Sequence, residues 1–261
     1  MHGLRGVSRY RSIWISDVHL GTRGCKAAFL LDFLNNVKCD RLYLVGDIVD
    51  GWRLKRSWYW PIAHNEIVSA VLDMAKSGTE VIYIPGNHDE MLRGYTSLQL
   101  GGVDVQRECI HTGPDGRRYL VTHGDDFDVV VKYAKWVALL GDWAYTVLLW
   151  LNNYLNDARR YLGLPYWSLS AYLKDKVKNA VEFVGAFESA LAAEAKRRDL
   201  DGVICGHIHR AEIRDIDGIR YMNSGDWVES CTALSESGDG SFEIVRWAEL
   251  DREQALVPAA A

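Results

Sequence analysis

The sequence has few of the features that mark secreted, disulfide-bonded or nucleic-acid-binding proteins. Its five cysteines are far apart and never form a Cys-x-x-Cys pair, so neither a disulfide framework nor a thiolate metal site is expected. The N-terminal stretch MHGLRGVSRYRS lacks the apolar core of a signal peptide. A formal net charge of -5 gives no electrostatic reason to expect nucleic acid as the main partner. Together these absences favour a cytoplasmic protein.

Long hydrophobic runs are missing as well. The most apolar stretch, residues 136–151, is interrupted by Gly141 and Asp142, and it is shorter than the roughly 20 apolar residues needed to span a bilayer. We therefore expect no transmembrane helix. The 261 residues are 48% hydrophobic and 25% charged, which is typical of a soluble globular protein with a substantial core.

In the first half of the chain, short β-branched runs alternate with longer patterns of helical period. Strands are predicted at residues 12–16, 41–45, 81–84, 117–123 and 202–207, and helices at 26–37 and 64–76. This alternation predicts an α/β protein with a parallel core covered by helices. After Gly206 the pattern changes to antiparallel hairpins, of which one turns at Asp217-Gly218.

Residues 127–198 have a helical pattern that is rich in Trp and Tyr. We interpret this segment as a helical insertion, or lid, within a single domain that covers residues 1–261. Basic pairs such as Arg159-Arg160 beside the aromatic residues suit contact with a membrane surface. Packing between helices explains the aromatic residues equally well.

Polar clusters follow five of the predicted strands. They contain Asp17 and His19, Asp47 and Asp50, Asn87 and His88, His123, and His207 and His209. Taken singly, each cluster has an ordinary explanation as a turn or a strand end. Because the carboxyl ends of strands in an open α/β sheet share one crevice, the repetition of the pattern predicts that the clusters converge on one site.

The residue types in these clusters indicate a metal centre. Carboxylate, amide and imidazole ligands without thiolate suit Mn²⁺, Fe or Zn²⁺ and do not choose among them. Residues two apart point to the same side of an extended chain, so the pair Asp17 and His19 can face one ion, as can His207 and His209. The whole set is larger than one ion needs, which predicts two divalent ions bridged by a carboxylate. The candidate ligands are Asp17, His19, Asp47, Asn87, His123, His207 and His209.

The ordered set D-x-H, G-D-x-x-D, G-N-H-D, H and G-H-x-H resembles the signature of the calcineurin-like metallophosphoesterases, and it extends from Asp17 to His209. The resemblance implies an αββα sandwich of two mixed β-sheets flanked by helices. It also implies hydrolysis at phosphorus with two divalent ions, for which Mn²⁺ is the metal we expect. One ion would be held by Asp17, His19, Asp47 and His209, and the other by Asp47, Asn87, His123 and His207.

The same resemblance implies two catalytic residues that are not ligands. His88 would be the general acid for the leaving oxygen, and Asp50 would orient His88 and help to keep it protonated. The segment DGWRLKRSWYW, residues 50–60, is interpreted as a cationic and aromatic loop close to the metals. Its candidate substrate-binding residues are Trp52, Arg53, Lys55 and Arg56, and the alternative is a solvated loop.

Within the family, the chain looks most like the UDP-2,3-diacylglucosamine pyrophosphatases of lipid A biosynthesis. This likeness rests on SDVHL, GDIVDGW, HGDD, GHIHR, NSGDWVES and the helical insertion. It implies a lipid-linked phosphorylated substrate and peripheral contact with the cytoplasmic side of the inner membrane. Those enzymes typically carry Arg where this chain has His88, so another lipid-linked or nucleotide-linked phosphoester stays open.

Two further classes are weighed against this reading. A soluble nucleotide phosphodiesterase or a protein phosphatase would need no long aromatic-rich lid. A non-catalytic scaffold on the same fold would be expected to have lost ligands, and none is missing from this sequence. The sequence carries no signal of an oligomeric state.

Overall fold

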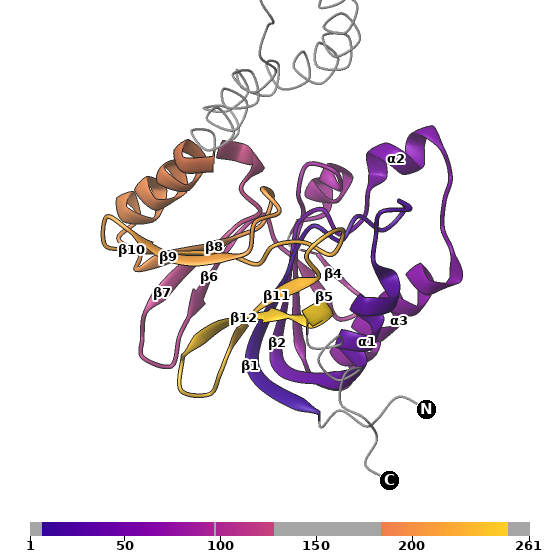
Figure 1. Cartoon of the computed structure of the whole chain (residues 1–261), viewed down its shortest axis with the longest axis horizontal. Helices are drawn as coiled ribbons and strands as arrows, with labels where there is room; N and C mark the ends of the chain where they lie inside the picture. Colours follow the sequence, from indigo (N-terminus) through magenta and orange to yellow (C-terminus); the bar gives the residue numbers. More distant parts are fainter. Residues whose placement is uncertain (1–6, 97, 128–183, 250–261) are drawn as a thin grey trace, which may run out of the picture. The chain divides into compact units, whose positions relative to one another are not determined.

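The computed structural model describes residues 7–96, 98–127 and 184–249 (Figure 1). The chain divides into two compact units, one made of Met1–Asp125 with Leu191–Ala261 and the other of Asp126–Ala190. Every described strand belongs to the first unit. Of the predicted lid at 127–198, residues 184–197 are helical, whereas residues 128–183 lie outside the described part of the chain. The lid therefore stays a prediction.

The first unit contains a seven-stranded mixed sheet in the order β12-β11-β1-β2-β3-β5-β4. Its strands are β1 (Ser8–Ile15), β2 (Val37–Val45), β3 (Glu80–Ile84), β4 (Gln99–Leu100), β5 (Val103–Val105), β11 (Thr232–Glu236) and β12 (Phe242–Arg246). β1, β2, β3 and β5 run parallel, and α1 (Ala27–Asn36) and α3 (Ile62–Lys76) connect the first three of them. The predicted parallel core is confirmed.

A second, five-stranded sheet has the order β6-β7-β8-β10-β9. Its strands are β6 (Cys109–Thr112), β7 (Arg118–Val121), β8 (Gly202–Cys205), β9 (Glu212–Ile216) and β10 (Ile219–Asn223). The predicted hairpin between β9 and β10 is confirmed: Asp217 and Gly218 have φ values of 52° and 84°, as a two-residue hairpin turn requires. The second predicted hairpin, formed by β11 and β12, joins the seven-stranded sheet instead.

Both faces of the seven-stranded sheet are buried, and the alternation of side chains along β1 shows how. Ile13 and Ile15 pack in the apolar cluster that includes Leu30 and Phe33 of α1. Trp14, which points to the opposite face, packs in the cluster that contains Tyr119 of β7. The fold is therefore two mixed sheets packed face to face and flanked by helices, as the family resemblance implied.

Most predicted boundaries differ from the structure by one or two residues, and the starts of β1 and β2 differ by four. β1 begins at Ser8, not at residue 12, and β2 begins directly after α1. The interpretation of residues 50–60 as a loop is wrong for Gly51–Arg56, which form helix α2. The reason is local: the Asp50 side chain accepts a hydrogen bond from the Arg53 amide at 2.8 Å and so caps the helix.

Within the described residues, no helix combines the length and the apolar character needed to cross a bilayer.

Candidate metal centre and active site

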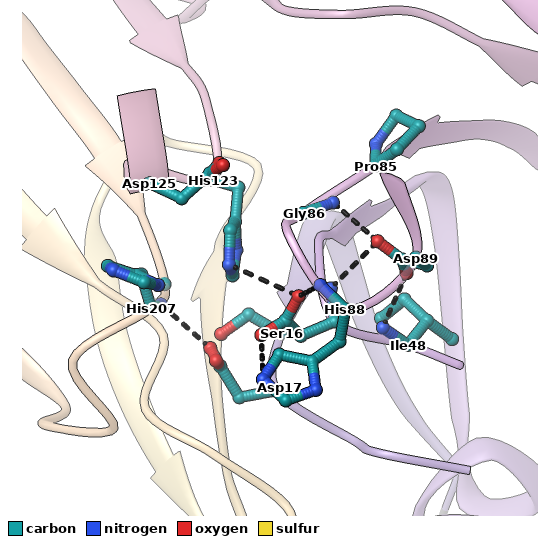
Figure 2. A network of polar contacts seen from close by, with 12 residues as sticks. Ser16, Asp17, Ile48, Pro85, Gly86, His88, Asp89, His123, Asp125 and His207 are labelled. Atoms are coloured by element: carbon teal, nitrogen blue, oxygen red, sulfur yellow. Dashed lines mark hydrogen bonds and ion pairs between the residues drawn. The ribbon is translucent and has the colours of Figure 1, made fainter. Parts of the chain in front are cut away.

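The five polar clusters follow strands of both sheets, not of one. Three come after β1, β2 and β3 of the seven-stranded sheet, and two come after β7 and β8 of the five-stranded sheet. The clusters of the two sheets are in direct contact at the carboxyl ends of their strands. The His207 amide, after β8, donates a hydrogen bond to Asp17 Oδ2, after β1, at 2.9 Å (Figure 2). The sequence predicted convergence at one sheet edge, whereas the structure forms the site between two edges.

The candidate ligand atoms form three overlapping sets, and within each set the atoms lie within 4.8 Å of one another. Two of the sets, which we call the ligand groups, are Asp17 with His19 and His209, and Asp47 with His123 and His207. The third set is His19 with Asp47 and His88, so it shares one residue with each ligand group. The spacing argument was therefore wrong for the last pair, since His207 and His209 separate into different groups. The division distributes the histidines as the family resemblance implied, and the assignment of all seven ligands to two ions stays a prediction.

Asp47 lies between the two groups. Its Oδ1 is 3.5 Å from His123 Nε2, and its Oδ2 is 3.9 Å from His19 Nε2. Oδ1 thus faces one ligand group and Oδ2 faces the other, which is the geometry that a bridging carboxylate needs. Asp47 is only 2% exposed, so both oxygens are held in place by the surrounding protein.

Several candidate ligand atoms are buried without a hydrogen-bond partner among the described residues. They are Asp17 Oδ1, His19 Nε2, Asn87 Oδ1 and His123 Nε2. Buried polar atoms in folded proteins are nearly always satisfied. Four candidate ligand atoms without a hydrogen bond at one place therefore fit divalent cations as their missing partners. The donor set, made of oxygen and imidazole nitrogen, agrees with this.

The backbone of the site is strained in a way that the sequence did not reveal. Left-handed φ values are found at Asp17 (52°), His19 (53°), Asp47 (54°), His207 (72°) and His209 (54°). Such a conformation costs a non-glycine residue about 1–2 kcal/mol. The ligand pairs therefore lie in turns and not in extended chain, and the rest of the fold has to hold these turns in place.

The three glycines that precede ligands act mainly by leaving space. A Cβ on Gly86 would lie 2.3 Å from Asp47 Oδ1, and one on Gly206 would lie 2.5 Å from Asp17 Oδ2. Only Gly46, with φ +75°, also needs the conformational freedom of glycine. These contacts explain why glycine stands at the point where the loops after β2, β3 and β8 enter the site.

The Nδ1 atoms of two imidazoles have polar partners outside the centre, and these contacts orient the rings so that Nε2 points into it. His123 Nδ1 donates to the Val45 carbonyl at 3.0 Å, and His19 Nδ1 lies 3.3 Å from Asp50 Oδ2. Such partners are the usual support of metal-binding histidines. Burial disfavours a charged His123, but the Asp47 carboxylate outweighs this and raises the pKa of His123 to about 10. Binding of a cation to Nε2 would therefore release a proton.

His88 is held between an acid and an aromatic ring. Its Nδ1 lies 3.1 Å from Asp50 Oδ1, and its ring centroid lies 4.4 Å from that of Trp52. Burial lowers the pKa of His88, but the carboxylates of Asp50 and Asp47 more than compensate and raise it above its ordinary value. The Nε2 end lies 3.9 Å from Asp47 Oδ2. A proton held at this atom is thus close to the predicted metals.

Asp89, for which the sequence suggested no role, fixes the loop that carries His88. It is fully buried and accepts hydrogen bonds from the Ile48 amide at 2.8 Å and the Gly86 amide at 2.5 Å (Figure 2). It also accepts one from the Tyr83 hydroxyl at 2.5 Å. The loops after β2 and β3 are thereby joined by one carboxylate. An acid directly after His88 was the available signal, but its partner Ile48 is distant in sequence.

A cavity of about 590 Å³ opens beside the metal-ligand groups. Its lining includes His19, His88 and His209 together with Arg23, Arg53 and Arg56. Of the predicted substrate-binding residues, Arg53 and Arg56 thus face the cavity. Lys55 and Trp52 are not part of its lining, and Arg23 is a basic residue that the sequence analysis missed.

Comparisons with known proteins agree with this centre. The calcineurin-like phosphoesterase family matches residues 10–211, and the chain belongs to this family. It is 25% identical over 250 residues to a UDP-2,3-diacylglucosamine hydrolase of Haemophilus influenzae, covering 88% of this chain and 98% of that protein. It is also 25% identical over 237 residues to the enzyme of the same name from Azotobacter vinelandii, with coverage of 88% and 95%.

Among solved structures, an archaeal phosphodiesterase aligns with a TM-score of 0.44 and 13% identity, over 90% of this chain and 98% of that one. The family and the hydrolases related in sequence identify the chain as a metal-dependent phosphoester hydrolase.

Proposed function

We propose that the protein hydrolyses the pyrophosphate bond of UDP-2,3-diacylglucosamine or of a related lipid-linked substrate, with two Mn²⁺ ions, at the cytoplasmic side of the inner membrane. The hydrolytic part rests on one observation: unsatisfied ligand atoms surround Asp47, and His88 lies beside them. The choice of substrate is supported by the names of the sequence relatives and by the NSGDWVES and GHIHR motifs.

The ions, when bound, would supply a positive field that stabilises charge developing on the phosphoryl oxygens. The residues that would hold them are Asp17, His19, Asp47, Asn87, His123, His207 and His209. The chain itself supplies the positioning. Asp47 fixes the distance between the two ligand groups, and the hydrogen bonds of His19 and His123 set the direction of their Nε2 atoms.

His88 is proposed as the general acid for the leaving oxygen. Asp50 contacts its Nδ1 and favours the protonated ring, so the proton at Nε2 is available to the leaving group. Asp50 also contacts His19 with its other oxygen, which was not foreseen. One carboxylate thus aligns a proposed ligand and the proposed acid.

A substrate panel tests this proposal. Purified protein with added Mn²⁺, Zn²⁺ or Fe²⁺ is assayed on UDP-2,3-diacylglucosamine, on bis(p-nitrophenyl) phosphate and on cyclic and linear nucleotide diesters. We expect release of UMP from the first compound, with Mn²⁺ giving the highest rate, and loss of turnover in Asp47→Asn. Hydrolysis of nucleotide diesters with no turnover of UDP-2,3-diacylglucosamine would instead support the soluble-substrate alternative.

A further inference from the structure

Three guanidinium groups from two separate segments line the cavity beside the metal-ligand groups. Arg23 comes from the loop after β1, and Arg53 and Arg56 come from α2. The same cavity contains His88 and His209, so these arginines share a cavity with the proposed acid and a proposed metal ligand. We call Arg23, Arg53 and Arg56 the arginine group.

The two segments converge because the loops after β1 and β2 are bonded to each other. The Leu20 amide donates to the Ile48 carbonyl and the Asp50 amide to the Leu20 carbonyl, both at 2.8 Å. Gly21 has φ +101°, and a Cβ at this position would lie 2.7 Å from Leu54 of α2. The Arg23 loop therefore packs directly on the helix that carries the other two arginines.

Helix geometry separates the arginines of α2 from its lysine. Positions 53 and 56 are three residues apart and share a helix face, whereas position 55 lies on a different one. This agrees with the cavity lining, which includes Arg53 and Arg56 but not Lys55. Lys55 is an exposed base on the same helix, so it offers a matched control.

Within the described part of the chain, no carboxylate forms an ion pair with any member of the arginine group. Other arginines do have such partners, for example Arg93 with Asp125 at 2.7 Å and Arg41 with Glu80 at 2.8 Å. Asp50 also lines the cavity, but its oxygens face His19, His88 and the Arg53 amide. The cavity therefore presents uncompensated positive charge.

Arg23 is also held in place by an aromatic ring. Its guanidinium carbon lies 4.9 Å from the centroid of the Tyr59 ring, which lines the same cavity. A cation–π contact of this kind favours one position of a side chain that is otherwise exposed. The donors of Arg23 are thus pre-positioned for an anion, and planar guanidinium groups match phosphate oxygens well.

We propose that the arginine group binds the non-reacting phosphate of a substrate with two linked phosphates. The proposed metal centre already supplies charge for the reacting phosphoryl group, so three more unpaired cations beside it indicate a second anionic group. A cavity of about 590 Å³ has room for it. The enzyme would thereby select pyrophosphate diesters over esters with one phosphate. This inference rests on the proposed hydrolysis at the metal centre.

The test compares Arg23→Gln, Arg56→Gln and the control Lys55→Gln with the wild type, all loaded with Mn²⁺. The substrates are UDP-2,3-diacylglucosamine, which has two phosphates, and bis(p-nitrophenyl) phosphate, which has one. Hydrogen bonds to charged groups are strong enough that each arginine variant should lose about 10- to 100-fold in kcat/KM on the first substrate. Activity on the second substrate should change little, and Lys55→Gln should match the wild type on both.

Calorimetric binding of methylenediphosphonate and methylphosphonate gives a readout that does not depend on turnover. The arginine variants should weaken binding of the diphosphonate and leave that of the monophosphonate unchanged. Equal losses on both substrates, or no loss in either arginine variant, would overturn the inference. If the wild type cleaves neither substrate, the proposed function fails, and the phosphonate comparison alone decides whether the arginine group is an anion subsite.

Discussion

At Asp47, a single side chain connects the two ligand groups. Its two oxygens face His123 and His19 at 3.5 and 3.9 Å, whereas Asp17 belongs to one group only. This asymmetry makes the two carboxylates distinguishable by substitution. It also leads to a prediction about metal content.

We expect Asp47→Ala to lose both ions and Asp17→Ala to weaken mainly one, because only the first residue is placed to bridge. Elemental analysis of the purified variants measures this directly, with the wild type as reference. An Asp47→Ala protein that keeps two tightly held ions and full activity would refute the bridging assignment.

His88 is the second residue for which geometry makes a specific prediction. General acid catalysis is worth roughly 10²–10⁴ in rate, so His88→Asn should lower kcat by about that factor while leaving metal content close to that of the wild type. With a nitrophenyl leaving group, which needs no proton, the loss should be much smaller. A loss of the same size on good and poor leaving groups, or a loss of metal, would contradict the acid role.

Among the elements, α3 supports the loop that carries Arg23. The buried His64 of α3 accepts a hydrogen bond at Nδ1 from the Gly21 amide at 3.1 Å, which requires a neutral ring. Burial lowers the pKa of His64 below its ordinary value, in keeping with this role. The aromatic rings of Tyr59 and Trp60 lie edge-on to His64. His64 thus also packs α3 against the segment that joins α2 to α3.

This hydrogen bond should make stability depend on pH. Below the ordinary histidine pKa of about 6.5, the unfolded chain binds a proton that folded His64 resists, so the free energy of unfolding falls as the pH falls toward the folded pKa. His64→Asn keeps an acceptor oxygen but does not titrate. Thermal unfolding at pH 7 and pH 5.5 should therefore show a smaller drop for His64→Asn than for the wild type. Identical drops would mean that His64 is not the titrating group.

At the scale of the whole molecule, the proposed lipid-linked substrate needs an apolar surface beside the centre. We predict that the aromatic-rich lid at 127–198 provides part of this surface. The described residues add exposed apolar side chains next to the basic helix α2: Trp58 is 76% exposed and Ile62 is 75% exposed. Both features suit a protein that works at a membrane surface.

We therefore predict that acyl chains far from the scissile bond contribute to catalysis. Each buried CH₂ contributes about 0.8 kcal/mol, so UDP-2,3-diacylglucosamine should have a much higher kcat/KM than its deacylated form. The protein should also float with anionic liposomes at low salt and less so at high salt. Equal rates on both compounds, without flotation, would make the lid a structural insertion only.

Much of the fold followed from local patterns. Helices α1 and α3, predicted at 26–37 and 64–76, the parallel strands and the Asp217-Gly218 hairpin could be predicted because periodicity and turn residues are local properties of the chain. The short strands β4, β5 and β6 were not predicted, since runs of two to four residues carry little periodic signal. Helix α2 was missed because its start depends on a cap by Asp50, which was considered only as a catalytic residue.

The sequence alone determined which residues could act in the site, because donor chemistry belongs to the residue and the motifs stand at strand ends. The tertiary structure decided how they act together. It separated His207 from His209 through left-handed turns, gave Asp89 the role of joining two loops, and brought Arg23 beside Arg53 and Arg56. Each of these outcomes depends on contacts between segments far apart in the chain, and packing decides such contacts where local pattern cannot.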